Sequence, residues 1–265
     1  MTTVTDPSAP VFRFQVQPEF HEVPLGIGQD EDAFEERLRQ FARDYWGERE
    51  DLELQRALTA AMYGANAELL VAGGAVYNAL GIFPVGGGPD GSEPPERISR
   101  ATLTVSVREL ENPDPHLTAA GIAETLDKSA GNGDGTEVQP IALPAGPAVV
   151  HIAGTRAVWE LPEGPEGLDG PEGLDGPEGL DGPEGETAGG GGEHEEYLVR
   201  IEVWLPFPRD DRLLLLCLST PDVQDLYHYQ AVLADIAHTI TFGQDGEADG
   251  TASAAVPAVS PFSSY

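Results

Sequence analysis

The sequence predicts an α+β fold in which a single antiparallel sheet is packed by helices. Two patterns carry this prediction. Residues Ile98–Leu110 alternate apolar and polar side chains, as in a strand with one buried face and one wet face. Residues after Thr220 repeat apolar side chains at helical spacing, from Leu226 to Ile240. Once the segments rich in Gly, Pro, Ser and acids are set aside, roughly 180 residues remain, enough for one sizeable core.

The first third of the chain predicts an N-terminal arm followed by two helices. The arm, residues 1–29, reads as coil with a short extended piece at Val11–Val16. Asp30 caps a helix whose apolar side chains recur at helical spacing. A second helical run from about Asp51 to Ala72 ends at Gly73-Gly74. Its larger apolar side chains share one side of the helix: Leu54, Leu58, Ala61, Met62, Ala65 and Leu69.

Strands and two further helices are predicted for the rest of the domain. A short helix runs from about Pro115 to Lys128, and Thr220 with Pro221 begins the closing helix. The predicted strands are Ala75–Ile82, Ile98–Leu110, Glu137–Leu143, Ala148–Ile152, Thr155–Glu160, Tyr197–Leu205 and Arg212–Ser219. The domain therefore spans 30–242, and residues 243–265 are predicted to form a disordered tail.

A low-complexity repeat interrupts the domain at 161–196. Pro165–Gly182 holds three identical copies of Pro-Glu-Gly-Leu-Asp-Gly. Proline prevents ladder pairing, glycine adds backbone entropy and the acids repel one another, so a flexible, disordered insertion between two neighbouring strands is predicted. Calcium binding or capture of a basic partner is the functional alternative, although the sequence supplies no preorganised set of ligands.

The charge balance limits the partners. The chain has 46 acids against 14 bases and a net charge of −32. Nucleic acids and anionic membranes are therefore poor partners, because both require clustered Lys and Arg, and no nucleic-acid partner is predicted, whereas another protein with a basic surface remains open. No stretch approaches the length of a membrane span and the first residues do not resemble a secretion signal, so we expect a cytoplasmic protein without membrane insertion.

The sequence shows no motif typical of metal binding, catalysis or phosphate binding. The six histidines (His21, His116, His151, His194, His228 and His238) show no metal-ligand spacing. Cys217, the single cysteine, lies in an apolar strand without an adjacent histidine, and the glycine runs at Gly86 and Gly131 lack the context of a phosphate loop. Trp46, Trp159 and Trp204 are expected to pack internally, with interface anchoring as the alternative. No catalytic, cofactor-binding or metal residue is assigned, and no enzyme is predicted.

Three segments near the C-terminus carry a resemblance to a known family: Val203–Pro208, Arg212–Pro221 and Asp235–Phe242. A strand that ends in a Pro-x-Pro turn leads to an apolar strand, a Thr-Pro cap and a closing helix. This order resembles uncharacterised actinobacterial proteins with a Mog1/PsbP-like α/β/α sandwich. The resemblance spans about Ala72–Phe242, implies a binding or accessory fold, and carries over no active-site residue.

The sequence therefore predicts a non-catalytic, cytoplasmic protein-binding or accessory protein, whose process, partner and oligomeric state stay open. One alternative is a chaperone or adaptor for a secretion or envelope system, because an acidic α+β domain is suited to masking a basic client. The other is an enzyme of unrecognised type, which requires polar groups that converge in one pocket.

Overall fold

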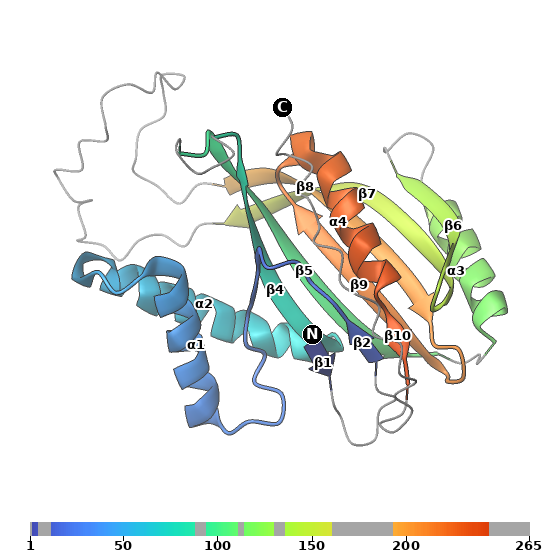
Figure 1. The fold of residues 1–265 in the computed structure, drawn as a ribbon, viewed down its shortest axis with the longest axis horizontal. Helices are drawn as coiled ribbons and strands as arrows, with labels where there is room; N and C mark the ends of the chain where they lie inside the picture. Colours follow the sequence, from blue (N-terminus) through green and yellow to red (C-terminus); the bar gives the residue numbers. More distant parts are fainter. Residues whose placement is uncertain are drawn as a thin grey trace. The chain divides into compact units, whose positions relative to one another are not determined.

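A seven-stranded, mostly antiparallel sheet is the central element of the fold (Figure 1). The computed structural model describes residues 2–4, 12–87, 94–110, 114–129, 136–160 and 193–243. Over these residues the chain is α+β with four α-helices, which confirms the predicted class. The chain divides into two units, Met1–Gly154 with Leu198–Tyr265, and Thr155–Tyr197.

The strand order in the sheet is β3-β4-β5-β9-β8-β7-β6. The strands are β3 (Phe20–Glu22), β4 (Ala75–Val85), β5 (Arg97–Glu109), β6 (Glu137–Leu143), β7 (Gly146–Glu160), β8 (Glu193–Pro206) and β9 (Arg212–Thr220). All the predicted strands are found within a few residues of their expected bounds, except that Ala148–Ile152 and Thr155–Glu160 belong to one continuous strand, β7.

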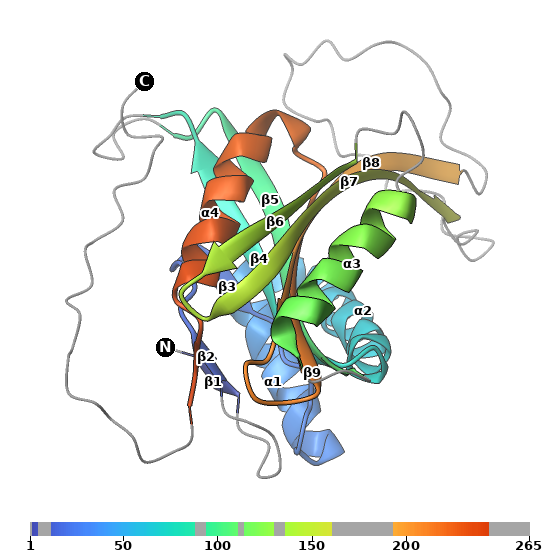
Figure 2. The same ribbon diagram turned by 90° about the vertical axis from the view of Figure 1, so that its right-hand side faces the viewer.

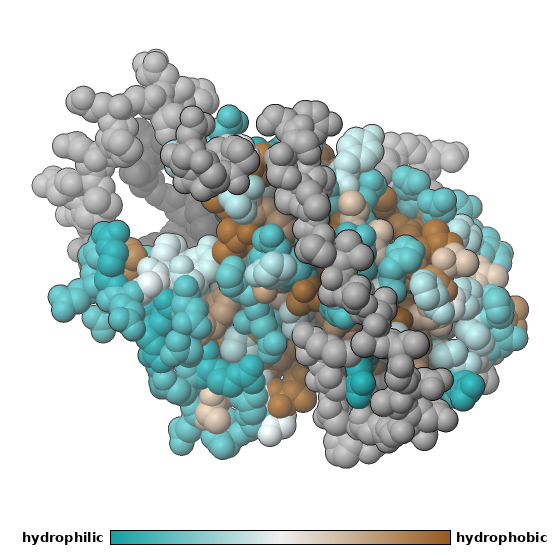
Figure 3. Space-filling model, in the orientation of Figure 1, coloured by the Kyte–Doolittle hydropathy of each residue, from teal (hydrophilic) through white to brown (hydrophobic). Residues whose placement is uncertain are grey.

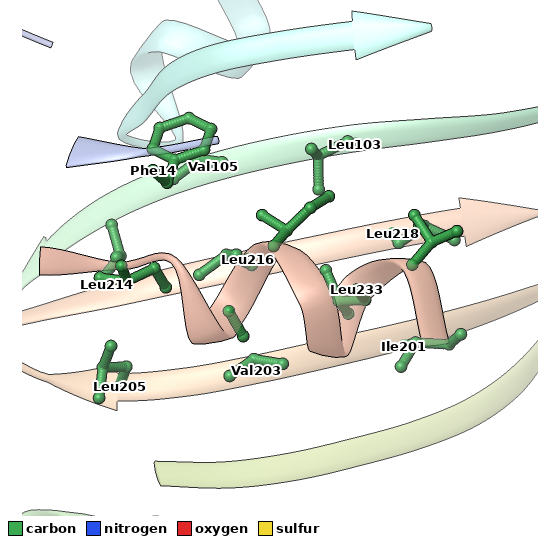
Figure 4. Packing of buried hydrophobic residues seen from close by; sticks show 14 of the residues in the cluster. Phe14, Leu103, Val105, Ile201, Val203, Leu205, Leu214, Leu216, Leu218 and Leu233 are labelled. Carbon is green, nitrogen blue, oxygen red and sulfur yellow. The ribbon is translucent and has the colours of Figure 1, made fainter. Parts of the chain in front are cut away.

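The main core lies between this sheet and helix α4 (Leu226–His238). Leu103 and Val105 of β5 pair with Leu218 and Leu216 of β9, so their side chains share the face that meets α4. Figure 4 shows Leu233 of α4 among these aliphatic side chains. Strand β9 is central, and its apolar run is buried on both sides, as expected for an inner strand.

The start of α4 differs from the prediction. Thr220 accepts a hydrogen bond from the Asp222 amide at 3.0 Å, but a 3-10 turn at Val223–Asp225 follows and the α-helix begins only at Leu226. Asp225 stands at the N-cap position, yet its carboxylate makes no cap hydrogen bond. Instead it accepts two hydrogen bonds from the Arg97 guanidinium, at 2.5 and 2.6 Å. The first residue of β5 therefore fixes the start of α4.

A small second sheet, of order β1-β2-β10, joins the two ends of the described chain. It consists of β1 (Thr2–Val4), β2 (Phe12–Phe14) and β10 (Thr241–Phe242). Phe12 and Phe14 are almost completely buried, and Phe14 meets the Tyr77 ring edge-on with centroids 5.2 Å apart. The segment expected as an arm thus contributes aromatic side chains to the main core.

Helix α3 (Pro115–Ser129) and helix α4 lie on opposite faces of the sheet (Figure 2). Helices α1 (Glu31–Trp46) and α2 (Glu53–Ala72) form a helical hairpin that reaches the sheet at β4. Asp30 caps α1 as predicted, because its side chain accepts a hydrogen bond from the Ala33 amide at 2.9 Å.

The repeat at Pro165–Gly182 lies outside the described residues, as does the tail beyond Gly243. The strands that flank the repeat, β7 and β8, are neighbours in the sheet, as the sequence predicted. Strand β8 begins at Glu193, so its first residues fall inside the range 161–196 that was assigned to the insertion.

Candidate protein-docking surface

Helix α2 exposes its large apolar side chains. Leu54, Leu58, Met62 and Leu69 have exposed fractions of 67%, 60%, 52% and 73%. With Ala61 and Ala65 they occupy about 100° of the helix circumference. This set of six residues is called the α2 stripe below. It is the same set that the sequence placed on one side of the helix, and the structure turns that side outward.

The packing side of α2 carries the small residues Gly64 and Ala67 beside the half-buried Tyr63. Ala67 is the one residue of α2 that is buried. A Cβ atom added to Gly64 would lie 3.2 Å from Leu38 Cδ1, so glycine permits α1 and α2 to approach closely at this point. Helix α2 therefore has two apolar sides. One packs against α1 through Gly64, Ala67 and Tyr63, and the other exposes the large side chains of the stripe.

Aromatic contacts and hydrogen bonds make the hairpin rigid. Phe41 and Tyr63 meet edge-on with ring centroids 5.3 Å apart. Burial raises the pKa of Tyr63, and the nearby Tyr45 raises it further. Trp46 Nε1 donates to Thr59 Oγ1 at 2.8 Å, and Arg56 donates to the Gly47 and Arg49 carbonyl oxygens. These contacts hold α2 in place without using the α2 stripe.

A groove of about 1150 Å³ runs along the hairpin beside the stripe. Its floor is apolar, formed by Leu25, Leu38, Ala61 and Ala65 among others, and Ala61 and Ala65 belong to the α2 stripe as well. Its rim is acidic, and the carboxylates there are Asp30, Glu31, Glu35 and Glu68. The stripe and the groove form one continuous apolar surface bordered by negative charge.

The arginines of α1 offset only part of that charge: Arg39 also lines the groove and pairs with the rim carboxylate Glu35, whereas they form no ion pair with Asp30, Glu31 or Glu68 in the described part of the chain. Arg39 bonds to Glu35 and to Glu36, and Arg43 bonds to Glu36 at 2.7 Å. The hydrogen bonds from Arg43 and Arg39 lower the pKa of the Glu36 carboxyl. Glu53 and Glu68 of α2 make no ion pair within the described residues, so both carboxylates are available to a partner.

The residues considered for chemistry lie apart from this surface. The sheet face opposite α4 carries a polar row in which Asn78, Thr104, Cys217 and Glu202 pair across adjacent strands. His151 Nδ1 lies 2.8 Å from Glu202 Oε2, and Trp204 Nε1 donates to the same oxygen at 3.3 Å. No sequence pattern indicated this row, because its members are far apart along the chain.

The row has the properties of a structural network. Burial raises the pKa of the Cys217 thiol, and the charge of Glu202 raises it further. A raised pKa disfavours the thiolate that nucleophilic catalysis requires. The buried Glu202 carboxylate already has hydrogen-bond partners in the protein. No group of three or more His, Cys, Asp or Glu side chains in the described ranges is arranged to hold a metal ion.

The remaining histidines are dispersed. His21 lies on β3, His116 in the first turn of α3 and His238 in the last turn of α4. His228 packs edge-on against Phe83 at 5.0 Å, and burial lowers its pKa despite the nearby Asp225. The side chains of His194 and Trp159, and the glycine run at Gly131, lie outside the described residues.

None of the described helices combines the length and apolar character that crossing a membrane requires. Comparison of the chain with protein-family models, with curated proteins and with solved structures found no match.

Proposed function

We propose that this protein is a non-catalytic, cytoplasmic binding or accessory protein, and that the α2 stripe docks a basic amphipathic helix of another protein. The exposure of the stripe is the observation that carries this proposal. Four large apolar side chains in one line on a rigid helix form a contiguous surface, which on soluble proteins usually marks an interaction site. A disordered insertion at 161–196 and a Mog1/PsbP-like arrangement are part of the same proposal.

The shape and charge of the surface specify the partner. A linear apolar stripe beside a groove accommodates a helix that presents apolar residues at i, i+4 and i+7, the common geometry of helix-in-groove recognition. Glu68 and the other rim carboxylates favour Lys and Arg on the flanks of that helix. A second copy of this chain is disfavoured as the occupant, because it would bring a second net charge of −32 against the same acidic rim.

A direct binding experiment tests this function. The full chain is titrated with a synthetic amphipathic helix built from Leu and Lys, and with a matched peptide in which Glu replaces Lys. We expect the basic peptide to bind. Leu58→Asp should weaken binding by about 2 kcal/mol or more, close to thirtyfold, since it removes apolar contact area and places a charge in the interface.

Leu117→Asp is the matched control. Leu117 lies on α3 and has the same exposed fraction as Leu58, 60%, but it is not part of the hairpin. Equal losses in both variants, or equal binding of the acidic peptide, would contradict docking at the α2 stripe. Sedimentation of the free protein reports self-association, which would replace the proposed partner with a second copy.

A chaperone or adaptor role would use the same surface for one dedicated client. Affinity capture with the intact chain, with Leu58→Asp and with a chain that lacks Pro165–Gly185 distinguishes the two roles. One identified client that is lost from Leu58→Asp and that carries a basic amphipathic helix indicates a dedicated role. Retention of that client by the deleted chain would assign the repeat a spacer role.

A further inference from the structure

The sheet is wider than the elements that cover it on the α4 side. Seven strands at about 4.8 Å spacing give a width of about 29 Å, whereas one helix with its side chains covers about 10 Å. The small sheet covers part of the rest through Phe12, Phe14 and Phe242. Strands β6 and β7 extend beyond α4, and a groove of about 410 Å³ remains between them and the helix.

The floor of this groove is aliphatic. Ile141 of β6 and Val150 of β7 are half-buried, and Ile152, Ile201 and Val203 continue the floor toward the core. The α4 wall presents Ala234 and Ala237, whose small side chains leave room beside the helix. Apolar colour gathers over β6 and β7 beside α4 in the space-filling view (Figure 3). A volume in the range of small-molecule sites and an apolar lining are the usual features of a ligand pocket.

Polar groups occur only at the margins of the groove. Strand β6 and helix α4 run in the same direction (Figures 1 and 2), so Glu137 and Tyr227 mark one end and Leu143 and His238 mark the other. The helix wall from Tyr227 to His238 is about 16 Å long. The amides of Gln139 and Gln230 also border the groove, and none of the described residues that line it is Lys or Arg.

We propose that the groove between α4 and strands β6 and β7 binds a single-chain alkyl amphiphile whose polar end is uncharged or cationic. The aliphatic walls offer no stacking platform for a planar ring, apart from the exposed Tyr227 at the margin, and they favour a flexible hydrocarbon chain. Glu137 and the acidic character of the chain disfavour an anionic head group. This site is distinct from the α2 stripe and does not depend on it.

Calorimetric titration of the full chain with three probes below their micelle-forming concentrations tests the site. Dodecyltrimethylammonium supplies the chain and a cationic head. Dodecanoate supplies the same chain with an anionic head, and butyltrimethylammonium supplies the head with a short chain. We expect the first probe to bind at least about tenfold more tightly than either of the others. Circular dichroism of the complex checks that the protein stays folded.

Two variants of the same helix locate the binding. Ala234 and Ala231 are both exposed on α4, but only Ala234 lines the groove. Ala234→Trp should weaken binding of dodecyltrimethylammonium by at least about tenfold, because the indole fills the groove, whereas Ala231→Trp should leave it unchanged. Absence of binding, equal binding in the two variants, or binding of dodecanoate or butyltrimethylammonium as tight as that of dodecyltrimethylammonium would overturn the proposal.

Discussion

Replacement of Tyr229 by Phe should make the stability of the protein less sensitive to alkali. Tyr229 is fully buried in α4, and its hydroxyl lies 2.6 Å from the buried Ser99 Oγ of β5. Burial raises the pKa of this phenol from 10.0 to about 12, because the folded protein holds the neutral form. In the unfolded chain the same phenol ionises near its ordinary pKa of about 10.

The sign and size of the effect follow from linkage. The contribution of the neutral phenol is complete below about pH 10 and is lost as the pH rises toward 12, since only the unfolded chain releases the proton in that range. Two pKa units correspond to about 3 kcal/mol, lost at about 1.4 kcal/mol per pH unit. Near pH 8 the Tyr229→Phe variant should be less stable than wild type by about 1–3 kcal/mol, because Ser99 loses its buried partner. The two stabilities should therefore converge between pH 10 and 12.

Urea unfolding at pH 8, 9, 10 and 11 measures this convergence as the difference in free energy of unfolding between wild type and variant. Tyr227→Phe is the matched control, since Tyr227 lies two residues away on the same helix and is 86% exposed. A difference between wild type and Tyr229→Phe that stays constant from pH 8 to 11, or the same trend in the control, would refute the link between the buried phenol and alkaline stability.

Two further substitutions test the ion pair between Arg97 and Asp225 and the backbone conformation at Gly74. Asp225→Asn should cost about 2 kcal/mol near neutral pH, less than a fully buried pair because Arg97 is one-third exposed. Arg97 lowers the pKa of Asp225, so wild type should lose this advantage as the pH falls below about 4, measured by acid titration of both proteins. Gly74→Ala should destabilise more than Gly47→Ala in thermal unfolding. Both glycines have positive φ, but a Cβ on Gly74 would lie 2.6 Å from the Val107 carbonyl oxygen, whereas Gly47 has open space.

Local patterns in the sequence predicted local structure well. The alternation around Leu103 placed β5, and the cap at Asp30 placed the start of α1. The closing helix was predicted to begin at Pro221, but α4 begins at Leu226. The reason is that Asp225 bonds to Arg97, which lies 128 residues away in the chain. No local pattern reports such a contact. The polar row of Asn78, Thr104, Cys217 and Glu202 was missed for the same reason, since strand register alone brings its members together.

The candidate docking surface shows a different limit of periodicity. Helical spacing identified the side of α2 that carries Leu54, Leu58 and Leu69. Periodicity alone does not indicate which side of a helix packs against the rest of the protein. The small residues at Gly64 and Ala67 decide this, because they allow close approach to Leu38 and leave the larger side chains outside. A helix with small residues on one side and large apolar residues on the other is the sequence signal that would have indicated an exposed stripe.

The negative charge of the chain gives these apolar surfaces a selective role. An exposed apolar stripe favours association with any apolar surface, including a second copy of the same protein. With a net charge of −32, two copies repel each other before the stripes meet, whereas a basic helix is attracted to the same rim. The repeat between β7 and β8 adds acids to the chain without adding bases, so it strengthens this discrimination whether or not it contacts a partner. Charge and exposure thus act together: the apolar side chains supply the contact area, and the carboxylates restrict which partner reaches it.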